Sequence, residues 1–485
     1  MLLLPFPSLM RNLQQIQAIL IFPFLFSSVA VKAQDPTAPM EKKEQEALYF
    51  AIQGFVGKSW NGSELYPDPC GWTPIQGVSC DLLDGLWHVT GLSIGPVMDN
   101  SLGCTTDADF TPHLFELKHL KSLYIFNCFS DPVNHSINIP SKDWEQLSGS
   151  LKTLELRSNQ ALASEVPAGL AGLSNLQSLV LTENRLTGEL PQELGNLIRL
   201  RRLVLSGNQL SGQIPASFGH KMTELLILDV SRNALTGPLP STLGGLRSLL
   251  KLDLSNNSLH GKLPEELGQL RNLTLLDLRN NKLTGGLSSG LKGMAKLQEL
   301  LLSDNPLGGN ITDFPWEEMR NLTTLELSNT GLSGSIPESI AGLKGLKFLA
   351  LDNNQLLGGV PSMFETLPAV GALYLNENNL TGQLGFSGEF YERMGSRFAA
   401  WGNPNLCYSA PGVVSTGHGP VGVQQCKGGQ GFPAAAGAGL DGDDGGGVSG
   451  QSSSPVASFA STAKSINVFL GKQLVTVLFV AVIVR

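Results

Sequence analysis

The residue types that most often perform catalysis are present in this sequence, but they lack the spacing that catalysis needs. The seven histidines are scattered along the chain: His88, His113, His119, His135, His220, His260 and His418. No H-E-x-x-H zinc motif, G-x-S-x-G nucleophile elbow or P-loop occurs. We therefore predict a protein that is not an enzyme, with no catalytic residue, no metal site and no cofactor.

The six cysteines point to disulfide chemistry. Cys70 and Cys80 lie ten residues apart beside Trp72, and a disulfide is favoured there over two free thiols or a zinc site, since no C-x-x-C or His pair accompanies them. Cys407 and Cys426 are predicted to close a C-terminal cap. The remaining two, Cys104 and Cys128, fall in neighbouring units and could pair across them, although connectivity cannot be derived from sequence. Disulfides at both ends of the chain indicate an oxidising, extracytoplasmic compartment.

Seven N-x-S/T sequons add to this indication, because such sites are glycosylated in secreted proteins. The predicted glycosylation sites are Asn61, Asn134, Asn256, Asn272, Asn310, Asn321 and Asn379. A glycan on Asn256 would narrow the face on which we expect a ligand to bind.

A repeat positions these residues. Leu176, Leu179, Leu181, Asn184 and Leu186 begin the pattern L-x-x-L-x-L-x-x-N-x-L-x-G-x-L-P, which returns every 24 or 25 residues over 151–384. Its apolar residues at positions 4 and 6 have the period of a strand, and stacked units bury their leucines together. The period predicts an α/β solenoid: a leucine-rich-repeat right-handed superhelix with a concave parallel sheet and disulfide-stapled end caps.

The asparagine at position 9 of each unit is expected to bond the backbone of the adjacent turn, where no strand ladder exists. Nine of ten regular units carry it: Asn159, Asn184, Asn208, Asn233, Asn257, Asn281, Asn305, Asn354 and Asn378. Thr330 replaces it in the tenth unit, where we predict a weaker joint between coils.

Composition divides the rest of the chain. Residues 1–33 resemble a secretory signal peptide, 34–88 form an N-terminal cap that includes a helix over 41–56, 89–384 hold about twelve repeats, and 385–426 form a C-terminal cap. Residues 427–462 are a Gly/Ser-rich flexible linker. Residues 463–485 are a glycosylphosphatidylinositol (GPI) anchor signal with Ser461 as the attachment site, or alternatively a weak transmembrane anchor that contains Lys472. No cytoplasmic signalling domain is expected after either one.

The concave sheet is the predicted binding surface, through repeat positions 2, 3, 5, 7 and 8. Acidic residues at position 5 (Asp229, Asp253, Asp277, Glu326) alternate with Arg201, Arg202, Arg232, Lys251 and Arg279. This charge pattern has two interpretations. Either it belongs to the L-D-L-S repeat itself and carries no information about a ligand, or it is a charged track that binds a peptide or another ectodomain. Apolar residues in exposed columns favour interaction. The predicted ligand-binding residues are Ile227, Lys251, Leu275, Asp277, Leu301, Phe348 and Tyr374.

Particular motifs resemble a known family. Leu210-x-Gly212-x-Ile214-Pro215 is similar to the plant extracellular leucine-rich-repeat class, and the segments at 68–72 and 77–80 resemble the N-terminal cap of plant receptor-like kinases and receptor-like proteins. The long first coils with Cys104 and Cys128, the Trp144 segment and the tail resemble the Piriformospora indica-insensitive protein 2 group. The resemblance implies a plasma-membrane-associated, kinase-less receptor-like protein that is linked to responses to a beneficial root fungus.

Two functions follow from the sequence. The first is a cell-surface protein that binds a peptide, a glycan or a receptor-kinase ectodomain in plant–microbe signalling, at the outer leaflet of the plasma membrane or in the apoplast. The alternative is a secreted inhibitor of microbial cell-wall-degrading enzymes. The net charge of −8 disfavours nucleic-acid binding, which needs basic patches.

Overall fold

The computed structural model describes residues 38–96, 101–129, 136–409 and 419–426. The predicted signal peptide, the linker, the C-terminal tail with Ser461, and the sequon at Asn134 lie outside these ranges. Contacts group residues 1–430 as one unit, which holds every described element, and residues 431–485 as another.

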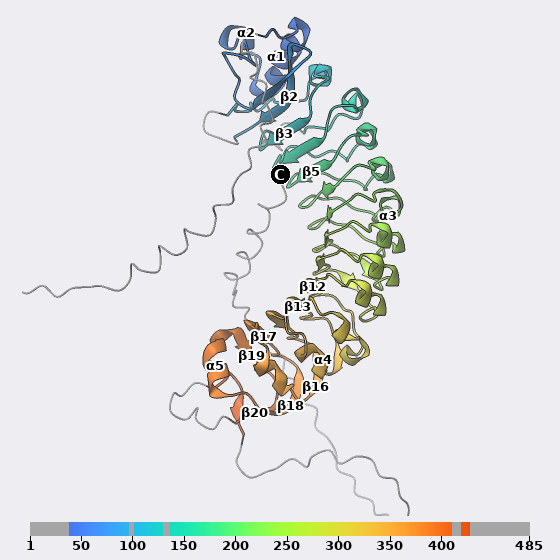
Figure 1. The fold of residues 1–485 in the computed structure, drawn as a ribbon, viewed down its shortest axis with the longest axis vertical. Coiled ribbons are helices and arrows are strands. Elements are labelled where there is room, and N and C mark those ends of the chain that lie inside the picture. The colour runs from blue at the N-terminus through green and yellow to red at the C-terminus, as the bar shows by residue number, and fades with distance from the viewer. Residues whose placement is uncertain (1–37, 97–100, 130–135, 410–418, 427–485) are drawn as a thin grey trace, which may run out of the picture. The chain divides into compact units, whose positions relative to one another are not determined.

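A sheet of 14 strands runs through the first unit, and its strands follow one another in chain order (Figure 1). β1 (Val78–Leu83) pairs antiparallel with β2 (Leu86–Ile94). The parallel strands that follow are β3 (Ser122–Phe126), β4 (Thr153–Arg157), β5 (Ser178–Thr182), β6 (Arg202–Val204), β7 (Ile227–Asp229), β8 (Lys251–Asp253), β10 (Leu275–Asp277), β12 (Glu299–Leu301), β13 (Thr324–Glu326), β15 (Phe348–Ala350), β17 (Ala372–Tyr374) and β19 (Phe398–Ala399). The predicted solenoid with a parallel sheet is confirmed.

Additional strands form in some coils on the far side of the turn that follows the asparagine. A five-stranded sheet contains β14 (Ser333–Ser335), β16 (Gln355–Gly358), β18 (Asn379–Leu384), β20 (Asn405–Tyr408) and β21 (Gln424–Gln425), and a separate pair contains β9 (His260–Gly261) and β11 (Lys282–Leu283). The glycine of L-x-G-x-I-P makes this turn possible, because Gly334 has φ +89°, which side chains rarely adopt.

Short helical segments return the chain from one strand to the next, and two further helices precede the first strand. The α-helices are α1 (Lys42–Val56), α2 (Gly62–Leu65), α3 (Ser217–Lys221), α4 (Glu338–Ala341) and α5 (Gly388–Met394). The 3-10 segments are η1 (Pro112–Glu116), η2 (Trp144–Leu147), η3 (Ala168–Gly172), η4 (Gln192–Asn196), η5 (Ser241–Gly245), η6 (Glu265–Gln269), η7 (Ser289–Gly293), η8 (Ile311–Asp313), η9 (Trp316–Glu318), η10 (Ser362–Thr366) and η11 (Gly395–Arg397). Among the described residues, no helix has the length and apolar character needed to cross a membrane.

The N-terminal cap closes the first coil of the solenoid. Helix α1 buries Leu48, Ala51, Ile52 and Phe55 completely, at the helical spacing that the sequence indicates. Disulfides join Cys70 to Cys80 and Cys104 to Cys128, with Cα–Cα distances of 5.7 and 5.1 Å. Cys407 and Cys426 are joined at the other end, so all three predicted pairs are present.

The asparagines form the predicted hydrogen bonds between coils, a series that we call the asparagine ladder. At Asn281 the side-chain amide donates to the Leu254 carbonyl of the preceding coil at 3.0 Å and accepts from the Leu259 amide at 3.0 Å. The same arrangement, in which the side chain bonds backbone of the preceding coil, occurs at all nine predicted asparagines. Because an unpaired buried backbone group costs about 1–3 kcal/mol, each asparagine fixes one joint of the solenoid.

Thr330 lacks these links to the preceding coil. Its hydroxyl donates to Leu327 in its own coil at 2.8 Å and lies 2.9 Å from the Asn354 side chain of the next coil. The backbone amide of Leu307, which an asparagine would be placed to accept, donates instead to the Asn305 carbonyl. The joint before Thr330 is therefore built differently from the others, and its weakness stays a prediction.

The ladder continues past Leu384, into the range expected to form the C-terminal cap. Asn403 accepts from Leu380 at 2.9 Å and donates to Leu375 at 3.0 Å, as the other asparagines do. Gly402 before it has the positive φ found at the same place in the regular coils. A further coil thus forms here, around β19.

Candidate functional site

Every second side chain on a strand of the main sheet points away from the core, toward the concave side. The register aligns Ile227, Lys251 and Leu275 in one row on β7, β8 and β10. The next outward row aligns Asp229, Asp253 and Asp277. The first three predicted ligand-binding residues therefore lie side by side, and three carboxylates of neighbouring coils are stacked next to them.

We call the charged residues of this region the carboxylate strip. It consists of Asp229, Lys251, Asp253, Asp277, Arg279, Glu299 and Glu326, which is five acids and two bases. Lys251 lies 3.3 Å from both Asp229 and Asp253, and Arg279 reaches Asp277 at 2.6 Å and Glu326 at 3.0 Å. Because two cations share five carboxylates, the strip keeps a net charge of −3 when all of them are ionised.

Burial and crowding shift the pKa values of three groups in the strip. The pKa of Asp253 is raised, first by burial and then by the carboxylates of Asp229 and Asp277. The pKa of Glu299 is also raised, by burial and by Glu326. Burial lowers the pKa of Lys251, but the neighbouring aspartates outweigh it and raise the pKa overall. Burial and neighbouring like charge therefore together disfavour the ionised form of the carboxyls of Asp253 and Glu299.

Part of the aspartate row also has an internal role. The Asp229 and Asp253 side chains each accept from the hydroxyl of the serine two residues later, Ser231 or Ser255, at 2.7 Å. This explains the L-D-L-S pattern as a local hydrogen bond that fixes the carboxylate. The second oxygen of each carboxylate faces Lys251.

The predicted apolar contact residues do not form one continuous patch. Leu301 and Asp277 expose only 5% and 4% of their surface, so they offer little to a ligand. Phe348 and Tyr374 contact each other edge to face, with centroids 5.6 Å apart, but Glu299 and Thr324 separate Phe348 from Leu275 in the same row. The prediction judged exposure from repeat position alone, without the neighbouring side chains, and it therefore overestimated the surface that these residues expose.

A second feature lies on β3–β7, toward the N-terminus. We call it the arginine hollow: a depression of about 290 Å³ whose lining includes Phe126, Arg157, Val180, Arg202, Val204 and Arg232. Arg157 and Arg202 share the Glu155 carboxylate, at 2.6 and 3.6 Å, and Arg232 lies 3.4 Å from Glu183. Three cations against two acids leave a net charge of +1.

Aromatic side chains border the hollow. Tyr124 and Phe126 on β3 each expose 37% of their surface, which is more than a core residue would show. Sequence reasoning missed both, as well as Arg157, because they belong to irregular or early coils. Their outward positions on β3 and β4 are the signal that could have revealed them.

The remaining predicted sites fall in several environments. Asn61, Asn256, Asn310, Asn321 and Asn379 are exposed, whereas Asn272 is half-buried and donates to the Arg247 carbonyl. Two of the histidines that are scattered in sequence, His88 and His119, meet near Glu44 in space.

Comparison with protein families matches the leucine-rich repeat over residues 149–210, and again over 224–246, 248–270, 272–294 and 321–343. The chain is 61% identical to Piriformospora indica-insensitive protein 2 of Arabidopsis thaliana over 393 residues, which cover 80% of this chain and 92% of that protein. It is 36% identical to receptor like protein 29 of the same plant over 34% of this chain and 36% of that protein.

Solved structures with the same fold include plant receptor ectodomains. The plant peptide hormone receptor RGFR1 in complex with RGF2 has a TM-score of 0.55 and 27% identity, over 70% of this chain and 57% of that one. The PEPR1–AtPEP1 structure has a TM-score of 0.58 and 28% identity, over 76% and 56%. This chain thus spans little more than half of either receptor chain.

Proposed function

This chain belongs to the plant leucine-rich-repeat receptor-like proteins, in the family of Piriformospora indica-insensitive protein 2, and from this premise we propose that it recognises a charged extracellular peptide through its concave sheet. The observation that carries the proposal is the separation of charge along that sheet. The arginine hollow has surplus positive charge, and the carboxylate strip beside it has surplus negative charge.

Such an arrangement selects the direction in which a peptide binds. An acidic segment is favoured over Arg157, Arg202 and Arg232, and a basic segment over the strip, while the reverse orientation places like charges together. Tyr124 and Phe126 supply apolar contact area at the end of the hollow. RGFR1 in complex with the hormone RGF2 shows that a related fold carries a peptide.

The spacing of the strands sets the length of the ligand. From β4 to β13 there are seven strand-to-strand steps, and at about 4.8 Å each they span about 34 Å. An extended peptide covers this distance with about ten residues. We therefore propose a peptide of about this length, acidic at one end and basic at the other.

The proposed setting is the outer face of the plasma membrane or the apoplast, with a receptor-kinase ectodomain as signalling partner and a GPI anchor at the C-terminus. Treatment of plant cells with phosphatidylinositol-specific phospholipase tests the anchor. Release of the tagged protein supports it, and retention in the membrane contradicts it.

Binding is tested with the full-length protein, made in plant cells, and ten-residue synthetic peptides that carry an acidic block and a basic block in either order or are neutral. One bipolar order should bind best. Arg202→Glu and Asp253→Asn should each weaken that binding by about tenfold, since a hydrogen bond to a charged group contributes about 1.5–3 kcal/mol.

The control is Arg320→Glu, an exposed charge reversal outside the main sheet, after η9, which should leave peptide binding unchanged. Equal binding of neutral and bipolar peptides, or equal loss with the control, contradicts the proposal. Capture of a pectin-degrading enzyme by the protein, without peptide binding, would favour the inhibitor function instead.

A further inference from the structure

Three potential metal ligands from separate elements converge in the N-terminal cap. Glu44 lies on α1, His88 on β2, and His119 follows η1. One ligand atom of each residue lies within 4.8 Å of the others. Their positions at 44, 88 and 119 give no motif in the sequence, so only the packing of α1 against the first coils brings them together.

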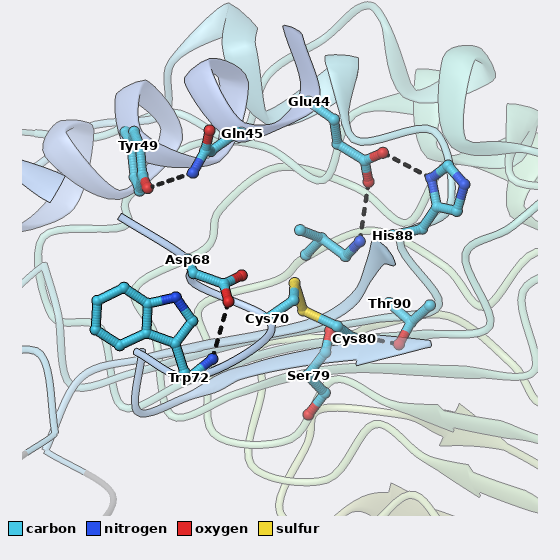
Figure 2. The surroundings of a disulfide bond; sticks show 11 residues. Glu44, Gln45, Tyr49, Asp68, Cys70, Trp72, Ser79, Cys80, His88 and Thr90 are labelled. Atoms are coloured by element: carbon cyan, nitrogen blue, oxygen red, sulfur yellow. Dashed lines mark hydrogen bonds and ion pairs between the residues drawn. A yellow bond between two sulfur atoms is a disulfide. The ribbon is translucent and has the colours of Figure 1, made fainter. Parts of the chain in front are cut away.

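The Glu44 carboxylate is fixed in orientation. Its Oε1 accepts from the Val89 backbone amide at 2.9 Å, and its Oε2 lies 2.7 Å from His88 Nδ1 (Figure 2). Glu44 and His88 are only 7% and 8% exposed. Because the backbone holds one oxygen, the other is presented to the imidazole with little freedom, as outer hydrogen bonds orient the ligands of a metal site.

His119 completes the cluster, and one of its ring nitrogens lacks a partner. Its ring lies against that of His88, with centroids 3.9 Å apart and planes at 47°. Its Nδ1 is buried and has no hydrogen-bond partner among the described residues. A buried ring nitrogen normally has a donor or an acceptor opposite it, so this atom needs an explanation.

We propose that Glu44, His88 and His119 bind a zinc ion. Two imidazoles and one carboxylate are a donor set that zinc uses with a fourth position left to water. The ion would take the place of the proton between Glu44 Oε2 and His88 Nδ1, while Oε1 keeps its bond to Val89. Tetrahedral ligands at bond lengths of about 2.0–2.1 Å lie about 3.4 Å apart. The Glu44–His88 pair, at 2.7 Å, must therefore open by about 0.7 Å, and ligand atoms as far as 4.8 Å apart must close by about 1.4 Å.

The ion would join the cap to the solenoid. It links α1 to β2 and to the loop before β3, near the Cys70–Cys80 disulfide (Figure 2). Binding to the folded chain alone would raise the melting temperature in proportion to the logarithm of the zinc concentration above the dissociation constant. The site is therefore a stabilising link in the cap, separate from the concave surface.

The test uses the full-length protein produced in plant cells, stripped with EDTA and then titrated with ZnCl₂ near neutral pH. We expect saturable binding of one ion per chain by calorimetry, and a melting temperature that rises with zinc. X-ray absorption at the zinc edge should show imidazole nitrogen ligands. His119→Ala, at a half-exposed position, should fold and bind zinc at least about tenfold more weakly, and Glu44→Gln should do the same.

His113→Ala is the matched control. His113 Nδ1 lies 2.9 Å from Glu116 Oε1, a similar pair on the neighbouring segment, but it belongs to no three-ligand group among the described residues. This variant should bind zinc as the wild type does. The proposal is overturned if the wild type shows no saturable binding or no imidazole at the zinc edge, if His119→Ala binds normally, or if the control loses zinc. Any of these results leaves Glu44 and His88 as a metal-free hydrogen-bonded pair.

Discussion

The joint before Thr330 provides a direct test of how the coils are held together. At Asn305 the side-chain amide donates to the Leu278 carbonyl of the preceding coil at 2.9 Å and accepts from the Leu283 amide at 3.1 Å. Among the described residues, the Thr330 side chain makes no such bond to its preceding coil. Thr330→Asn should therefore supply the missing link.

The expected change in the free energy of unfolding of Thr330→Asn follows from counting the hydrogen bonds gained and lost. An amide at this position would keep the bond that the Thr330 hydroxyl makes to Leu327 and would reach the Leu302 carbonyl in addition. The Leu307 amide already has a partner, the Asn305 carbonyl, so for this group one bond is exchanged for another. One net hydrogen bond stabilises by about 0.5–1.5 kcal/mol, and we expect about 1 kcal/mol. Thr330 is fully buried, and asparagine has a similar volume, so overpacking should be small.

Hydrogen exchange is the appropriate assay, because each repeat of a solenoid contacts only its neighbours and stability is local. Exchange of amides over 302–309 should slow by about fivefold in Thr330→Asn, with urea unfolding as a second measurement. The reverse variant, Asn305→Thr, should leave the buried Leu283 amide unpaired and cost about 1–3 kcal/mol. If neither variant alters exchange at its own joint, the ladder does not stabilise the solenoid as argued.

Two further changes test other parts of the chain. Asp253→Asn removes a carboxyl whose pKa burial and neighbouring aspartates raise above 3.8 in the folded state. Protonation at that site favours folding, so the wild type should gain stability as the pH falls through the raised pKa toward 3.8, and the variant should lack this part of the pH dependence in urea titrations. The double variant Cys104→Ser with Cys128→Ser removes a disulfide between residues 24 positions apart. It should lose about 2–4 kcal/mol of stability relative to the wild type, measured by calorimetry on both proteins without reductant.

The solenoid was predictable from sequence because its determinants are periodic and act between adjacent units. Leucine at positions 4 and 6 and asparagine at position 9 each meet the same residue of the next coil, so the period specifies their contacts. The coil around Asn403 was missed because Phe398 and Ala400 stand where leucines are usual. Its asparagine follows Asn378 by 25 residues, and that spacing was the available signal.

The surface was less predictable, for two physical reasons. Column positions show which way a side chain points, but neighbours decide how much of it remains exposed; the guanidinium of Arg279 contacts Asp277 and helps to bury it. The cluster of Glu44, His88 and His119 depends on how a helix packs against the open end of the solenoid. No repeat describes that packing, and the separation of the three residues in sequence conceals it.

The regularity that builds the fold also creates its electrostatic problem, and this links the sheet to its proposed role. In-register repeats place identical side chains about 4.8 Å apart, so Asp229, Asp253 and Asp277 are stacked as like charges. Lys251 and Arg279, which depart from the repeat, neutralise only part of that charge. We propose that the remainder attracts a basic ligand segment, through Asp229 and Asp253 rather than through the buried Asp277. Departures from the consensus, rather than the consensus itself, therefore determine what this surface can bind.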